Sequence, residues 1–174
     1  SFTFACRLYP THLGGREQAI ASCENLETDT RVELTIDAHG HLCGHIECGG
    51  IKTNAHIAHP LNQRQWTLAW ISLDTQARTL RIGCRQLDGI DAAAHARAAS
   101  SQLPSLPNAE VFAGLALNGT ALMVAACDPN TPAKHFNGKL ENPHLWQRAL
   151  TDADYQMLAD TDEQLVCVDA IARW

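Results

Sequence analysis

The densest group of side chains that could do chemistry lies between positions 39 and 48. It contains imidazoles, thiols and a carboxylate: His39, His41, Cys43, His45, Glu47 and Cys48, with His56 and His59 shortly after. Imidazole and thiolate are the ligands that zinc prefers. His41, Cys43 and His45 are the zinc candidates, because residues two apart in a strand point to the same face.

The spacing of these candidates argues against a compact zinc site. Neighbours on one strand face lie roughly 6.5–7 Å apart along the strand. Two of them can hold one ion, whereas three in a row cannot close a tetrahedron. Cys43 and Cys48 form a single C-x4-C pair, and no second cysteine pair follows. The pattern therefore favours the polar face of an antiparallel hairpin, with Cys48 buried.

Catalytic motifs are absent from the sequence. There is no G-x-S-x-G elbow, no glycine-rich phosphate loop and no H-E-x-x-H pair. Asp152 and Asp154 form a carboxylate pair, but they stand at the start of a predicted helix, where the helix dipole favours acidic side chains. We therefore predict no catalytic residue in this chain.

Composition limits the class of protein. With 174 residues, 45% of them hydrophobic, the chain is expected to form a single domain over residues 1–174. A net charge of -6 and scattered basic residues argue against nucleic acid as a partner, and no apolar run approaches a membrane span. Seven cysteines, an odd number, favour free thiols and a cytoplasmic setting. Because the chain starts at Ser1, we expect a domain excised from a longer protein.

Alternating apolar residues predict short strands along most of the chain. They occur at 2–8, at 32–36 with a return near 42–46, and at 66–73 paired with 79–84. Asn118-Gly119 predicts a hairpin turn, residues 88–108 a long connection with a helical turn near 92–98, and residues 165–171 a final strand beside the first. One short helix begins at Thr151, which is a good N-cap. This pattern predicts an all-β fold, a two-sheet antiparallel β-sandwich (jelly roll) with one short helix near the C-terminus.

The stretch HFNGKLENPHLWQRALTDADYQML, which starts at position 135, joins a predicted strand to this helix. Its structural residues are Phe136, Gly138, Leu140, Pro143, Trp146, Arg148, Leu150 and Thr151. Pro143 suits a bend or an edge strand, and Arg148 can bond turn carbonyls or pair with Asp152 or Asp154. Trp146 and Leu150 are spaced to cover one end of the sandwich, with the helix plugging it. We therefore interpret the stretch as a corner that closes the fold.

These residues resemble a known superfamily. Phe136-x-Gly138-x-Leu140, followed by Leu145-Trp146-x-Arg148-x-Leu150-Thr151, is similar to the laminin-G-like or concanavalin-A-like jelly roll. More narrowly, HFNGKLENPHLW resembles the sandwich domain of N,N-dimethylformamidase large subunits. That resemblance implies a separate catalytic domain, whose iron is held by tyrosines and a glutamate, and it carries no catalytic residue onto this chain.

The laminin-G-like resemblance makes calcium the other metal to consider. The candidate oxygen ligands are Asp74, Asp128 and Asn130. Calcium takes about six to eight oxygens from a converging loop, and no D-x-D-x-D-G loop is present. Asp128-Pro-Asn130 suits a turn at least as well. We therefore expect no cofactor in this domain, with calcium left as a possibility.

Two functional interpretations follow. The first is a non-catalytic module of a larger amidohydrolase-type protein, which packs against other domains or subunits or controls substrate access. The alternative is a lectin-type module for carbohydrate or another small ligand. Sugar-binding faces usually carry exposed aromatic rings. Because Trp66, Trp70 and Trp146 are placed in the core and only Trp174 is expected to be exposed, the lectin interpretation comes second.

Overall fold

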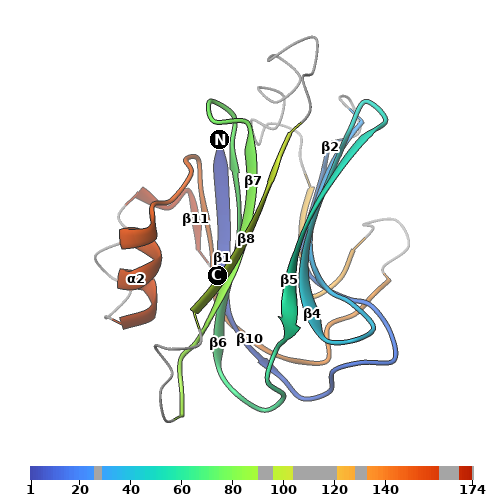
Figure 1. The fold of residues 1–174 in the computed structure, drawn as a ribbon, viewed down its shortest axis with the longest axis vertical. Helices are drawn as coiled ribbons and strands as arrows, with labels where there is room; N and C mark the ends of the chain where they lie inside the picture. Colours follow the sequence, from blue (N-terminus) through green and yellow to red (C-terminus); the bar gives the residue numbers. More distant parts are fainter. Residues whose placement is uncertain (26–28, 90–95, 104–120, 128–132, 161–168, 174) are drawn as a thin grey trace.

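Two antiparallel sheets lie face to face, and a helix lies outside one of them (Figure 1). The computed structural model describes residues 1–25, 29–89, 96–103, 121–127, 133–160 and 169–173. The arrangement confirms the predicted two-sheet β-sandwich with one short helix, α2 (Asp152–Asp160), near the C-terminus.

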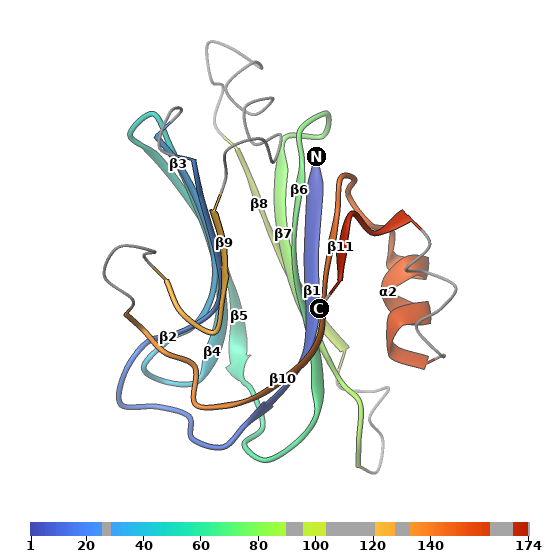
Figure 2. The ribbon, with the colours of Figure 1, turned by 180° about the vertical axis from the view of Figure 1, so that it is seen from behind.

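The strands divide into a six-stranded and a five-stranded sheet, as seen from both sides in Figures 1 and 2. In spatial order, the larger sheet contains β11 (Ala172–Arg173), β10 (Gly138–Trp146), β1 (Phe2–Pro10), β6 (Thr67–Asp74), β7 (Thr79–Gln86) and β8 (Ala96–Gln102). The smaller sheet contains β5 (Ile51–Pro60), β4 (His41–Cys48), β3 (Thr30–Ile36), β2 (Gln18–Asn25) and β9 (Ala121–Val124).

The main core fills the space between the sheets. Alternate residues of each strand point into it, as Phe4 and Leu8 do from β1 and Leu34 does from β3. Gly44 of β4 faces Ile82 of β7 so closely that an added Cβ would lie 2.3 Å from Ile82 Cγ2. A glycine at this position therefore lets the two sheets approach each other.

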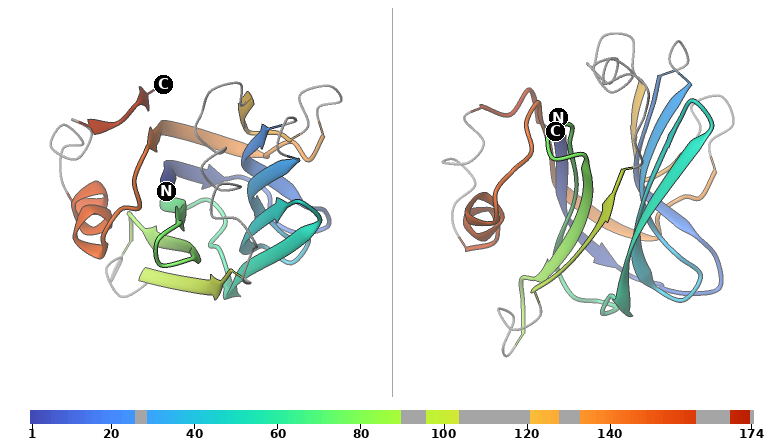
Figure 3. Two further views of the ribbon diagram at one scale, coloured as in Figure 1. Left: turned by 90° about the horizontal axis from the view of Figure 1, so that it is seen from above. Right: turned by 45° about the horizontal axis from the view of Figure 1, so that its top comes forward.

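The helix α2 lies outside the six-stranded sheet (Figure 3), and a second, smaller core lies between them. It consists of Ala5, Leu68, Trp70, Trp146, Leu150, Tyr155 and Leu158. The sequence interpretation that the helix plugs one end of the sandwich is therefore wrong. The helix covers a sheet face, because Trp70 and Trp146 point away from the main core and need an apolar cover.

The start of α2 is fixed by a reciprocal cap. Asp154 N donates to Thr151 Oγ1 at 3.3 Å, and Thr151 N donates to Asp154 Oδ2 at 2.7 Å. Arg148 adds ion pairs with Asp154 at 2.9 Å and Asp169 at 2.6 Å. Of the two partners considered for Arg148, the structure selects Asp154, while Asp152 pairs with Arg81 on β7.

Strand β10 carries the proline within a bulge. Its pairing with β1 shifts between Ala5 and Arg7, opposite Asn142 and Pro143, and Asn142 has a φ of 51°. Ahead of the bulge, Phe136 and Leu140 are half-buried against the main core. A Cβ at Gly138 would lie 2.4 Å from the Tyr9 carbonyl oxygen, so only glycine fits beside β1 here.

Several sequence predictions need correction. Residues 96–102 of the expected connection form strand β8, where a helical turn was predicted, and β2 was not predicted at all. The last described strand, β11, pairs with β10, and it is β10 that lies beside β1. The predicted Asn118-Gly119 turn and the strand residues Leu165 and Cys167 lie outside the described residues.

The thiols of the described residues are free. Cys6, Cys43, Cys48, Cys84 and Cys127 are buried, and Cys23 is half-buried. The burial of Cys48 agrees with the hairpin interpretation. Within the described parts of the chain, no helix is long and apolar enough to cross a bilayer.

Candidate functional site

The outer face of the five-stranded sheet is polar and hollowed. Side chains of β3, β4 and β5 that point away from the core form a hollow of about 260 Å³ with two residues of the flanking segments. We call it the polar hollow; its polar lining consists of Glu17, Arg31, Glu33, His45, Glu47, Lys52, Asn54 and Lys134. Strand alternation produces this face, since each of the three strands places every second residue outward.

Glu33 lies at the floor of the polar hollow. The residue is only 7% exposed, an unusual position for a carboxylate. Arg31 Nε lies 3.1 Å and Lys134 Nζ 3.7 Å from its two oxygens. The Arg31–Glu33 ion pair is poorly oriented for a hydrogen bond. Arg31 Nε and Glu33 Oε1 are both buried, and neither has a hydrogen-bond partner among the described residues. Buried polar atoms are nearly always hydrogen-bonded, so this poorly aligned ion pair is an unusual feature of the floor of the hollow.

The rim of the polar hollow is a set of paired polar groups. Lys134 Nζ lies 2.9 Å from Glu17 Oε2, and His45 Nδ1 lies 2.9 Å from Asn54 Oδ1. Partial burial disfavours the charged form of Lys134, but the hydrogen bond with Glu17 and the charge of Glu33 outweigh it and raise the pKa of Lys134. This ammonium group is therefore charged at neutral pH.

The charges of the polar hollow balance. Glu17, Glu33 and Glu47 face Arg31, Lys52 and Lys134, three groups of each sign. A balanced set offers many hydrogen-bond donors and acceptors without a net field that would select an anion or a cation. Neutral ligands rich in hydroxyl groups match this chemistry, since each hydroxyl both donates and accepts.

A second polar cluster lies on the same sheet, at the turn between β3 and β4. Asp37 Oδ2 lies 3.0 Å from His41 Nδ1 and 3.9 Å from His56 Nε2. The ligand atoms of these three residues all lie within 4.8 Å of one another. We call this group the Asp37 cluster. It joins β4 to β5 across a register shift, and the rings of His41 and His56 meet edge to face at 4.9 Å.

The Asp37 carboxylate is held in place by the turn itself. Its Oδ1 accepts backbone N–H bonds from His39 at 2.8 Å and His41 at 2.9 Å. Partial burial acts to raise the pKa of Asp37, but these backbone bonds and the His41 side chain outweigh burial and hold the pKa below its ordinary value. The carboxylate is therefore ionised at neutral pH, with Oδ2 turned toward the two imidazoles.

The three zinc candidates do not come together. His41 contacts Asp37 and His56, whereas His45 hydrogen-bonds Asn54. The Cys43 thiol donates weakly to the His41 carbonyl oxygen at 3.6 Å, and burial first, with nearby carboxylates, raises its pKa to about 11. His41 and His45 therefore do not meet on their strand face. Each imidazole contacts residues outside β4 instead.

Of the calcium candidates, only Asp74 belongs to the described residues. Its Oδ1 accepts N–H bonds from Gln76 at 2.9 Å and Ala77 at 3.0 Å, which closes the turn between β6 and β7. Asp128 and Asn130 lie outside the described residues. Asp74 therefore has a structural role that accounts for its position.

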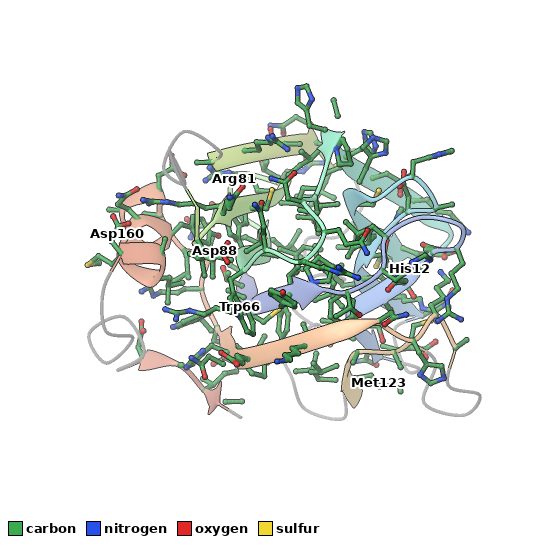
Figure 4. All side chains as sticks on the ribbon, turned by 90° about the horizontal axis from the view of Figure 1, so that it is seen from below. His12, Trp66, Arg81, Asp88, Met123 and Asp160 are labelled. Atoms are coloured by element: carbon green, nitrogen blue, oxygen red, sulfur yellow. The ribbon has the colours of Figure 1, made fainter. Side chains whose placement is uncertain are left out.

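A groove of about 290 Å³ lies between α2 and strands β7 and β8. Arg81 pairs with Asp152 at 2.7 Å and Arg85 with Asp160 at 2.6 Å, which ties the helix to the sheet. Figure 4 shows Arg81 and Asp160 in this part of the molecule, with Met123 of β9 on the opposite side. The aromatic residues that line the groove, Trp70 and Tyr155, are only 5% and 7% exposed. These groups fasten the helix and leave little surface for a ligand.

Most residues of the polar hollow and of the Asp37 cluster were not predicted as site residues from the sequence. Glu33 lies within the predicted strand 32–36 and Arg31 directly before it, and charge at alternate positions is their one local signal. Asp37 directly precedes the Ala38-His39-Gly40 turn, a position typical of a side chain that caps the turn. Lys134 had no local signal, because segment 133–137 reaches β2 and the residues after β9 through long-range backbone bonds such as Ala19 N to Lys134 O.

Comparisons with known proteins bear on the fold. No protein-family profile and no curated protein matches the sequence. Among solved structures, a SAP-like pentraxin from Limulus polyphemus is similar at 13% identity and a TM-score of 0.57, over 91% of this chain and 69% of that one. The LG1-3 region of the laminin α2 chain is similar at 12% identity and a TM-score of 0.65, over 87% of this chain and 28% of that one.

A carbohydrate-binding module belongs to the same group of structures. It is the CBM40 of the Ruminococcus gnavus IT-sialidase, bound to α2,3 sialyllactose, with 13% identity and a TM-score of 0.64 over 92% of this chain and 82% of that one. At these identities the likeness establishes the fold alone. The laminin-G-like jelly roll expected from the Phe136 to Thr151 motif is confirmed as a fold, while the dimethylformamidase resemblance finds no support.

Proposed function

We propose that this domain is a lectin-type module that binds a neutral carbohydrate or a similar hydroxyl-rich ligand in the polar hollow. The observation that carries the proposal is Glu33, a carboxylate that is 7% exposed at the floor of a hollow in the outer face of the sheet. Its Oε1 and the neighbouring Arg31 Nε are buried without a hydrogen-bond partner in the described structure. A ligand hydroxyl that enters the hollow can accept from Lys134 and donate to Glu17, whose side chains are 34% and 37% exposed.

The surroundings of Glu33 support the same ligand class. Lys134, His45 and Asn54 add donors and acceptors around the floor, and the charges of the lining balance. At about 260 Å³ the hollow is slightly smaller than typical ligand sites, which begin at roughly 300 Å³. It is therefore suited to a small part of a glycan, such as one or two sugar rings.

The comparisons favour this proposal over the amidohydrolase-associated module. The similar structures include a sialidase carbohydrate-binding module, and their shared fold makes a carbohydrate partner plausible for this chain. A role in domain packing or subunit assembly of a dimethylformamidase-like protein has no comparable support. Because no Phe, Tyr or Trp ring of the described residues lines the polar hollow, affinity for a sugar is expected to depend on hydrogen bonds and to be weak.

A glycan array probed with the domain, followed by calorimetric titration of each bound glycan, tests the proposal. Glu33→Gln removes the acceptor charge at the floor, and Glu141→Gln, an exposed carboxylate on β10 of the other sheet, is its matched control. We expect binding by the wild type and by Glu141→Gln, and a loss of about tenfold or more in affinity for Glu33→Gln, since hydrogen bonds to charged groups contribute about 1.5–3 kcal/mol.

A second variant keeps the test valid if Glu33→Gln does not fold. Asn54→Ala alters the rim at an exposed position, and far-UV circular dichroism shows whether each variant is folded. The proposal fails if no glycan binds to the wild type. It also fails if folded Glu33→Gln and Asn54→Ala bind the same glycan as tightly as the wild type does.

A further inference from the structure

We propose that the Asp37 cluster is a binding site for a divalent transition-metal ion of the zinc type. The site consists of Asp37 Oδ2 and one ring nitrogen each of His41 and His56, three atoms within 4.8 Å of one another. The proposal is independent of carbohydrate binding, because it involves no residue that lines the polar hollow.

The distances nearly match those of a metal site. Zinc binds imidazole nitrogen and carboxylate oxygen at about 2.0–2.2 Å, so two ligand atoms in a tetrahedron lie roughly 3.3–3.6 Å apart. The separations from Asp37 Oδ2 are 3.0 Å to His41 and 3.9 Å to His56. The His56 side chain is 50% exposed, so a small rotation of its ring can bring the nitrogen to bonding distance.

The backbone preorganises the three ligands. Two N–H bonds to Asp37 Oδ1 fix the carboxylate, with Oδ2 hydrogen-bonded to His41 Nδ1. His41 opens β4, and His56 stands opposite Cys43 in the β4–β5 pairing, so strand register places both rings on the same outer face. Ligands held in this way lose little conformational entropy when an ion binds.

A turn-capping role explains only part of this arrangement. The bonds to Oδ1 close the turn after β3 without any help from the imidazoles. His56 comes from a third strand, is half exposed, and contributes nothing to the turn. A hydrogen bond with His41 Nδ1 accounts for one of the two imidazoles at Asp37 Oδ2. The approach of the second imidazole, from His56, is the feature that a metal ion explains and turn formation does not.

The donor set selects the class of ion. Imidazole suits zinc, copper and nickel, whereas calcium and magnesium require mainly oxygen ligands. The three protein ligands leave at least one position of a tetrahedral ion for water, and the exposure of His56 gives solvent access to it. We therefore expect Zn²⁺ to bind and Ca²⁺ and Mg²⁺ not to bind here.

Calorimetric titration of the untagged protein with Zn²⁺ tests the proposal, with Co²⁺ absorption as a spectroscopic reading of the coordination. His56→Ala is the diagnostic variant, since its exposed side chain is not needed for folding. His59→Ala, an exposed histidine near the end of the same strand, is the matched control. Asp37→Asn keeps an oxygen for the backbone bonds while it removes the ligand charge.

We expect one Zn²⁺ per chain for the wild type and for His59→Ala. Affinity should fall by about 10- to 100-fold or more in His56→Ala and Asp37→Asn, because loss of a ligand costs at least as much as loss of its outer partner. The proposal is overturned if the wild type binds no Zn²⁺. Equal losses in His56→Ala and His59→Ala, or no loss in His56→Ala, would also overturn it.

Discussion

The indole ring of Trp70 on β6 and the phenol ring of Tyr155 on α2 lie nearly parallel, with centroids 3.9 Å apart and planes 8° apart. This stack is the centre of the second core, which fixes α2 on the outer face of the six-stranded sheet. Ion pairs from Arg81 and Arg85 flank it on the sheet side. The apolar contact supplies most of the attachment, because exposed ion pairs contribute little to stability.

Replacement of Tyr155 by alanine is expected to lower the free energy of unfolding by about 3–5 kcal/mol, the usual cost of truncating a buried aromatic residue. Tyr155 is 7% exposed and has Trp70 as its stacking partner. Met157→Ala on the same helix is the control, since Met157 is 40% exposed and its truncation should change stability by less than about 0.5 kcal/mol. Urea denaturation measures both. Equal effects of the two variants would contradict the assigned packing.

Gly83→Ala is expected to destabilise the domain by about 1–3 kcal/mol, because overpacking forces neighbours out of place. A Cβ at position 83 would lie 2.1 Å from Trp70 Cζ2, since the indole ring lies over this glycine of β7. The measurement is a double-mutant cycle by urea denaturation with Trp70→Leu. The cost of Gly83→Ala should largely vanish in the Trp70→Leu background. If it persists there, the clash with the indole is not its cause.

The pair of Arg148 and Asp154 predicts acid sensitivity. The Arg148 hydrogen bond, which outweighs partial burial, and the bonds from Thr151 lower the pKa of Asp154 from 3.8 to about 2. A depressed carboxyl pKa adds stability that is complete above the unfolded value of 3.8 and is lost as the pH falls toward 2. With allowance for solvent screening, we expect this loss to be about 1 kcal/mol.

Denaturation between pH 6 and pH 2 measures that loss, and Asp154→Asn should flatten the curve in this range. Arg148→Gln is the partner variant and should reduce the slope as well, since it removes the guanidinium hydrogen bond that contributes most to the lowered pKa of Asp154. An unchanged slope in both variants would contradict the assignment.

The sequence predicted those elements whose residues alternate in hydrophobicity. It located β1, β3, β6 and β7, together with the capped start of α2, because each carries a local signal. It missed β8, whose sequence ARAASSQ has little strand propensity and is held by pairing with β7. It also missed β2, where the buried polar residues Gln18 and Ser22 obscure the alternation.

The candidate sites were less predictable, for a physical reason. The period of two predicted that His41 and His45 share one strand face, and the structure gives the two imidazoles different partners, Asp37 and Asn54. The partners of His41 depend on the register of β4 with β5, which shifts between His41 and Cys43. Such a shift has no local signal, so the approach of His56 to Asp37 could not be read from the sequence.

Slow thiol alkylation is the last prediction. Burial raises the pKa of Cys6 to about 12 and those of Cys23 and Cys84 to about 11. Because the thiolate is the nucleophile, a rise of about two pH units lowers the reactive fraction at pH 8 about a hundredfold. Iodoacetamide should therefore label these three residues in the native protein at least about a hundredfold more slowly than in urea, as read by peptide mass spectrometry. Cys167→Ser removes the thiol that lies outside the described residues. Rapid native labelling of Cys6 or Cys84 would contradict the assigned core, since both side chains face the interior between the sheets.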